Sequence, residues 1–134
     1  MTIELWALFG TTATLWIAIV AQQLALDKAA GAKYALSNRE QDHNSTGATL
    51  LHGRLTRTVR NHVEGLALFS PLVLTASVVG ISNVWTQYAA ITFFVTRFLH
   101  FLFYAGGITP FRSFAWAIGF FLAIGSFVFG LVTG

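Results

Sequence analysis

Apolar residues dominate this chain in long runs, each of a length that suits a membrane-spanning helix. Residues 5–26 contain no charged side chain, and residues 65–96 contain none over 32 positions. About 20 apolar residues suffice for one helical crossing, so the second run is too long for a single helix. Its natural break is the stretch Gly-Ile-Ser-Asn at 80–83. With the last run at 113–134, the pattern predicts four spanning helices in one domain, residues 1–134, at about 3–26, 53–82, 85–106 and 112–133.

The composition also indicates a membrane protein, and it limits the chemistry that the side chains can perform. Of the 134 residues, 55% are hydrophobic and only 10% are charged, whereas soluble domains carry about 25% charged residues. The fold class expected is therefore an all-α integral membrane bundle. The basic residues lead directly into apolar helices, which argues against a nucleic-acid partner. The chain has no cysteine, so any thiol chemistry must use a thiol of the substrate, and the four histidines show no metal-ligand spacing.

The basic residues also predict the orientation. All eight lysines and arginines lie between 27 and 60, in the second half of the third run, or at position 112. With four crossings these positions share one side of the membrane, which the positive-inside rule assigns to the cytoplasm. We therefore expect a multi-pass protein with a cytoplasmic loop at 27–52 and both termini on the opposite side.

Two helical faces carry polar side chains at the basic side of the bundle. The first face comes from positions i, i+3, i+4 and i+7 of the second helix: Arg57, Arg60, Asn61 and Glu64. The second face lies on the third helix and carries Arg97, His100 and Tyr104. The short turn at 106–110 brings Arg112 and Ser113 alongside it. An unpaired arginine at mid-membrane costs roughly 2.5–3.5 kcal/mol. Four arginines against one glutamate therefore indicate an anionic ligand, such as one with two carboxylates and an amine.

Structural roles would also account for several of these residues. Arg60 and Glu64 could simply neutralise each other as an i, i+4 pair. Arg97 could be an interhelical lock to Glu64, and the remaining arginines could be ordinary anchors at the basic side. His100 and Tyr104 could pack at an interface. His62 points away from the first polar face, which favours packing, while His43 and His52 are expected in the loop.

The order and spacing of the motifs resemble the MAPEG family of membrane-associated proteins in eicosanoid and glutathione metabolism. This family includes microsomal glutathione transferases, leukotriene-C synthases and prostaglandin E synthases. The resemblance rests on three segments: Arg57-Thr-Val-Arg60-Asn61-His-Val-Glu64, Arg97-x-x-His100-x-x-x-Tyr104 and Arg112-Ser113. Their spacing is most similar to that of the microsomal prostaglandin E synthases.

The resemblance implies a homotrimer of four-helix subunits that binds glutathione, as cosubstrate, between neighbouring protomers. It places Arg112 or Ser113 at the thiol. It assigns binding of the tripeptide to Arg57, Arg60, Asn61, Glu64, Arg97, His100 and Tyr104, with Glu64 receiving the amine.

The activity that the resemblance implies is that of a glutathione-dependent membrane transferase or peroxidase of lipid metabolism or detoxification. The first expectation is a microsomal-type glutathione S-transferase, and the second is an isomerase or peroxidase similar to the prostaglandin E synthases. The second substrate would be a lipophilic electrophile that arrives from the bilayer. The alternatives are a catalytically silent lipid-binding or scaffold protein, and a small transporter or proton relay built on Arg97, Glu64 and His100.

Overall fold

A computed structural model describes residues 1–38 and 50–134, and within these ranges all regular secondary structure is helical, with no strand. Its elements are α1 (Ile3–Ala30), α2 (Ala32–Ala35), α3 (Leu50–Val79), α4 (Val84–Gly106), α5 (Thr109–Ala117), the π-helical turn η2 (Ile118–Ala123) and α6 (Ile124–Thr133). The last three run on as one helix, so the described residues form four helices with the length and apolar character to cross a membrane. The all-helical bundle expected from the apolar runs is confirmed.

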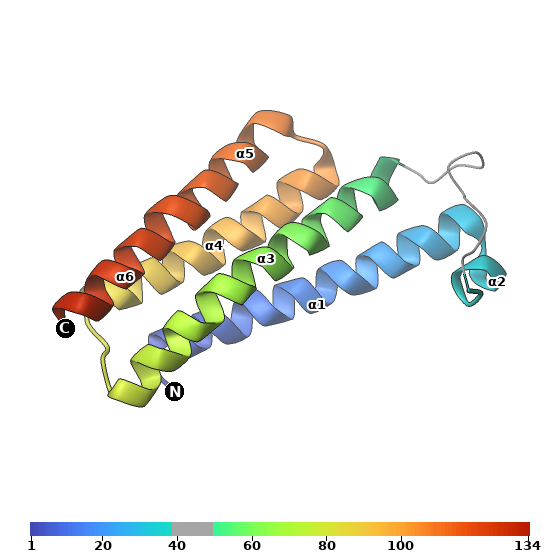
Figure 1. Cartoon of the computed structure of the whole chain (residues 1–134). Coiled ribbons are helices and arrows are strands. Elements are labelled where there is room, and N and C mark those ends of the chain that lie inside the picture. Colours follow the sequence, from blue (N-terminus) through green and yellow to red (C-terminus); the bar gives the residue numbers. More distant parts are fainter. Residues whose placement is uncertain (39–49) are drawn as a thin grey trace.

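The four long helices lie side by side (Figure 1). Both termini and the α3–α4 turn lie at one end of the bundle, while α2 lies at the other end (Figure 1). Four crossings therefore return the chain to the side on which it started. The cytoplasmic placement of the α2 end remains a prediction of the positive-inside rule, and residues 39–49 of the expected loop lie outside the described residues.

The helices extend further into the 27–52 segment than the sequence pattern predicts. The first helix continues to Ala30, and α3 already begins at Leu50, so His52 is helical rather than part of a loop. Gly31 ends α1 with a φ of 83°, and its N–H bonds the Asp27 carbonyl at 2.9 Å. Charged residues mark where a helix leaves the apolar layer, but they do not stop helical hydrogen bonding, and Lys28 in the last turn even suits the helix dipole.

Both breaks that the sequence predicts between the later helices are tight turns. Asn83 caps α4 by accepting hydrogen bonds from the backbone N–H groups of Trp85 and Thr86. At the other end of α4, Gly107 has a φ of 74°, and its N–H bonds the Tyr104 carbonyl at 3.1 Å. This left-handed cap leads directly into α5, so it fixes the start of the helix that carries Arg112 and Ser113.

Aromatic rings pack the centre of the bundle, where α3, α4 and α6 meet. Phe69 stacks on Phe93 with ring centroids 4.0 Å apart, and Phe127 meets Phe69 edge-on at 5.6 Å. Small residues let the helices approach, for example at Ala89 and Ala90, which are almost fully buried. Helix association inside lipid depends on such close van der Waals packing, because lipid tails remove the hydrophobic driving force.

A buried carboxylate ties the helices together at the end that holds the termini. Glu4 of α1 is only 2% exposed, and it accepts hydrogen bonds from the hydroxyls of Thr86 at 2.6 Å and Ser82 at 3.0 Å. The side-chain amide of Asn83 donates to the Gly130 carbonyl at 2.8 Å. The apolar runs do not predict this hydrogen-bond network. The feature of the sequence that could have indicated it is Glu4, the only acidic residue ahead of Asp27.

Candidate functional site

A pocket of about 470 Å³ lies near the end of the bundle where α4 turns into α5, a size suited to a small-molecule ligand. It draws side chains from three helices. Five of the nine site residues expected from the sequence line it: Asn61 from α3, His100 and Tyr104 from α4, and Arg112 and Ser113 from α5. Segments far apart in the sequence therefore converge here, with Asn61 alone from the first polar face and four residues from the second.

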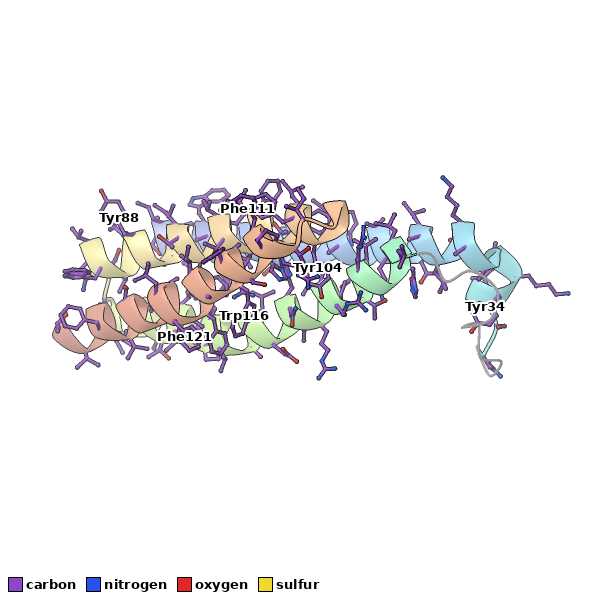
Figure 2. All side chains as sticks on the ribbon, turned by 90° about the horizontal axis from the view of Figure 1, so that it is seen from above. Tyr34, Tyr88, Tyr104, Phe111, Trp116 and Phe121 are labelled. Carbon is purple, nitrogen blue, oxygen red and sulfur yellow. The ribbon has the colours of Figure 1, made fainter. Side chains whose placement is uncertain are left out.

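Tyr104, which lines this pocket, contacts two arginines from different helices. Arg57 of α3 donates from Nε to the Tyr104 hydroxyl at 3.1 Å. On the ring face, the Arg112 Cζ atom lies 4.5 Å from the centroid, and the His100 ring meets Tyr104 edge-on at 5.3 Å. Figure 2 shows Tyr104 and Trp116 in the middle part of the molecule, between Tyr88 and Tyr34 toward its two ends. Arg57 is thus placed at the edge of the pocket through its contact with Tyr104.

Arg97 lies behind the pocket rather than on its surface. The residue is 1% exposed, its Nη2 donates to the Trp116 carbonyl at 3.5 Å, and its Cζ lies 5.1 Å from the Phe93 centroid. Its Nε and Nη1 have no hydrogen-bond partner. Gly119 makes room for the guanidinium, because a Cβ there would lie 3.2 Å from Nη2, while a Cβ on Gly65 would lie at contact distance, 3.4 Å from Cζ.

His62 is a packing residue, as the sequence pattern favours. Its ring nitrogens lie 3.0 Å from the carbonyl oxygens of Thr58 on α3 and Arg97 on α4, and it is fully buried. The ring also lies 5.7 Å from the His100 ring, measured between centroids. His62 therefore connects the two helices directly behind the pocket.

Arg60 and Glu64 stay outside the pocket in the single chain. They form the i, i+4 ion pair at 3.1 Å, with side chains 81% and 57% exposed. The alternative in which Arg97 forms an interhelical ion pair with Glu64 is wrong. Glu64 pairs with Arg60, and the Arg97 guanidinium points toward α5. The charged pair consequently occupies an outer face of α3 that no other helix among residues 1–38 and 50–134 covers.

Trp116 and Ala117 also line the pocket, although the polar pattern of the sequence did not predict them. Helical spacing could have identified Trp116, since it follows Arg112 by four residues and Ser113 by three and so lies on the same face of the helix. The wall they form continues into η2, whose Gly119 packs against the buried Arg97. Among residues 1–38 and 50–134, no three histidine, aspartate or glutamate side chains are grouped to hold a metal ion.

The helices and the pocket define a multi-pass integral membrane protein with a basic site near one end of its helix bundle. The chain belongs to the MAPEG family, whose family model matches residues 3–132, essentially the whole chain. Comparison with curated proteins and with solved structures gives no match. Membership confirms the resemblance seen in the sequence motifs and places the protein in a family associated with glutathione and eicosanoid metabolism.

Proposed function

We propose that this protein binds glutathione as a cosubstrate and stabilises its thiolate for attack on a lipophilic electrophile or hydroperoxide from the bilayer. The observation that carries the proposal is the composition of the pocket wall. Arg112 and Ser113 stand beside Tyr104 and His100, and none of the lining side chains is acidic. The pocket thus offers a cation and hydroxyl groups to a negative charge and presents no competing carboxylate.

Activation of the glutathione thiol requires only a modest stabilisation of its thiolate form. A cysteine-type thiol has a pKa near 8.5, so only a few per cent is ionised at neutral pH. Lowering that pKa by about two units requires roughly 2.7 kcal/mol of preferential binding of the thiolate. A fixed guanidinium in a partly dry site can supply this much, because the low dielectric strengthens its attraction for the sulfur anion.

The remaining charged residues suit the ends of the tripeptide. Arg57 and Asn61 lie at or near the pocket on the α3 side, where they would receive carboxylate or backbone groups. Arg60 and Glu64 face outward from the same helix, so they can reach a ligand in a neighbouring subunit's pocket or in the seam between subunits. The proposal therefore includes a homotrimer with sites between protomers, in which Glu64 receives the ligand amine.

The second substrate would arrive through the membrane. Large apolar side chains beside the pocket on α5, such as Phe111 and Phe114, are exposed at the surface of the chain and would face lipid or a neighbouring subunit. With an electrophilic carbon, the thiolate sulfur forms a C–S bond and the displaced group takes the proton that the thiol released. With a hydroperoxide, the sulfur takes the terminal oxygen and the alcohol leaves. A second glutathione then yields the disulfide and water.

Ligand binding to the purified protein in detergent tests this proposal. We expect saturable glutathione binding with a new ultraviolet thiolate absorbance, and no such absorbance with S-methyl glutathione. The dimethyl ester and the N-acetyl derivative should bind at least about ten-fold more weakly, because each removes a charge that the basic site or Glu64 would contact. If glutathione does not bind, the catalytic proposal fails, and a silent lipid-binding protein becomes the better description.

A further inference from the structure

Tyr104 has a position in this pocket that ligand binding alone does not explain. Its hydroxyl accepts a hydrogen bond from Arg57 of α3, while its ring face lies under Arg112 of α5. The Arg57 Cζ lies farther from the ring centroid, at 5.9 Å, than the Arg112 Cζ, at 4.5 Å. Arg57 therefore contacts Tyr104 mainly through the hydroxyl and lies at the outer limit of ring contact, whereas Arg112 lies closer, over the ring face.

The ring is itself held firmly in place. Tyr104 is only 8% exposed, and the His100 ring packs edge-on against it at 5.3 Å. Its backbone carbonyl accepts the N–H of Gly107 in the left-handed cap that ends α4. A side chain fixed by burial, by a ring contact and by its own helix cap presents a surface of defined position to its neighbours.

By contrast, no polar group in the described part of the chain holds Arg112. Within the described ranges 1–38 and 50–134, no hydrogen bond or ion pair engages its guanidinium, and its interaction of defined geometry is the one with the Tyr104 ring. A guanidinium within about 6 Å of an aromatic centroid is attracted by the negative ring face, and more strongly where water is excluded. This contact leaves all the N–H groups at the guanidinium edge free for a ligand.

We propose that Tyr104 is a positioning residue that assigns two arginines their separate tasks. Its ring holds the Arg112 guanidinium at the pocket wall, and its hydroxyl holds Arg57 at the pocket edge. The inference rests on the proposed function for the meaning of Arg112, since it deepens the account of how that site is organised. The geometric part, that the ring orients Arg112, can be tested without any thiol.

Two substitutions separate the ring from the hydroxyl. Tyr104→Phe keeps the ring and removes the acceptor of Arg57, so we expect the glutathione KM to rise about ten-fold while the thiolate absorbance per bound ligand stays. Tyr104→Leu removes both, so we expect kcat and the thiolate absorbance per bound ligand to fall about ten-fold as well. Tyr88→Leu is the matched control, because Tyr88 lies on the same helix near its other end and is 69% exposed.

A proton NMR measurement on the detergent-solubilised protein tests the orientation directly. A guanidinium over a ring face has its Nε–H and Cδ–H resonances shifted upfield by the ring current, and the Arg112 signals are assigned by their loss in Arg112→Lys. We expect the upfield shift in the wild type and in Tyr104→Phe, and its disappearance in Tyr104→Leu. Tyr104→Phe is decisive even if Tyr104→Leu does not fold.

The outcomes distinguish this inference from the proposed function. An unshifted Arg112 signal in the wild type or in Tyr104→Phe overturns the positioning role, whatever the enzyme does. An equal loss of thiolate in Tyr104→Phe and Tyr104→Leu also overturns it, because the hydroxyl would then act on the ligand itself. A shifted Arg112 signal without any thiolate absorbance in the wild type contradicts the proposed function and leaves the positioning role supported.

Discussion

Arg112 and Ser113 are neighbours in the sequence and both line the pocket, yet they would act on a thiol in different ways. A guanidinium attracts the sulfur anion by its charge, while a hydroxyl can only donate one hydrogen bond. The neutral thiol benefits little from either group. A residue that acts on the thiolate should therefore affect turnover more than ligand binding.

Replacing Arg112 tests that distinction at the scale of one residue. We expect Arg112→Ala to lower kcat by roughly 10²–10³, the range for losing one group that stabilises developing charge, and to remove the thiolate absorbance. Glutathione binding should stay within a few-fold. Arg112→Lys should recover only part of kcat, because an ammonium lacks the planar fork of a guanidinium.

Ser113→Ala is the control for Arg112, since it removes a hydroxyl from the same wall without changing the charge. If Ser113→Ala abolishes the thiolate absorbance and Arg112→Ala leaves it, the hydroxyl is the activating group and the assignment to Arg112 is wrong. If both variants keep the absorbance and the turnover, neither residue activates the thiol, and steady-state kinetics with spectra of the bound state would show this.

The π-helical turn η2 is the element that connects the fourth helix to the buried charge. A π-turn inserts one extra residue into a helix and occurs often at functional sites. Here it places Gly119 against α4, where a Cβ would lie 2.5 Å from the Thr96 hydroxyl oxygen and 3.2 Å from Arg97 Nη2. The Thr96 hydroxyl cannot turn away freely, because it donates to backbone carbonyls of its own helix.

Gly119→Ala should therefore destabilise the protein. Overpacking a tight contact costs about 1–3 kcal/mol, which we expect to appear as a lower midpoint of thermal unfolding in detergent. Gly125→Ala is the matched control, because a Cβ there would meet nothing within 4 Å. Alanine also favours a helix over glycine, so Gly125→Ala should be neutral or slightly stabilising. Equal effects of the two substitutions would contradict the close contact between η2 and Arg97.

At the scale of the whole molecule, the exposed pair of Arg60 and Glu64 is the feature that a single chain leaves unexplained. Charged side chains on spanning helices usually face the interior of a bundle or a water-filled cavity. In the part of the chain that the structure describes, Glu64 does not line the pocket that Arg112 lines. A site that uses both, as proposed, must draw them from two neighbouring subunits.

Mixed oligomers test this arrangement. Glu64→Gln and Arg112→Ala subunits should each give assemblies of low activity when expressed alone. When the two are co-expressed with different tags and purified as mixed trimers, interfaces that combine an intact Glu64 with an intact Arg112 should restore part of the turnover. Native mass spectrometry would verify three copies per assembly. A monomer, or mixed trimers no more active than either parent, would contradict a site between protomers.

The sequence by itself determined the number of long helices and the helical faces that carry the polar residues. Charge-free runs of sufficient length leave few alternatives inside a bilayer, because every backbone N–H and C=O must bond within its own helix. The i, i+3, i+4 and i+7 spacing likewise placed His100 and Tyr104 on one buried face of α4. The order of the motifs was enough to indicate the family that the family model confirms.

Only the tertiary structure decided which of those residues meet and how. Arg97 and His100 are one turn apart on the same face of α4, yet His100 lines the pocket and Arg97 lies behind it. The Arg97 guanidinium lies against Gly119 of the π-helical turn, which belongs to another helix and which no periodic pattern in the sequence indicates. Arg112 lies over the Tyr104 ring, and Arg57 bonds its hydroxyl. Both contacts depend on how three helices cross. Periodicity fixes the face of a helix on which a side chain lies, but contacts between helices depend on packing, and packing is a property of the assembled bundle.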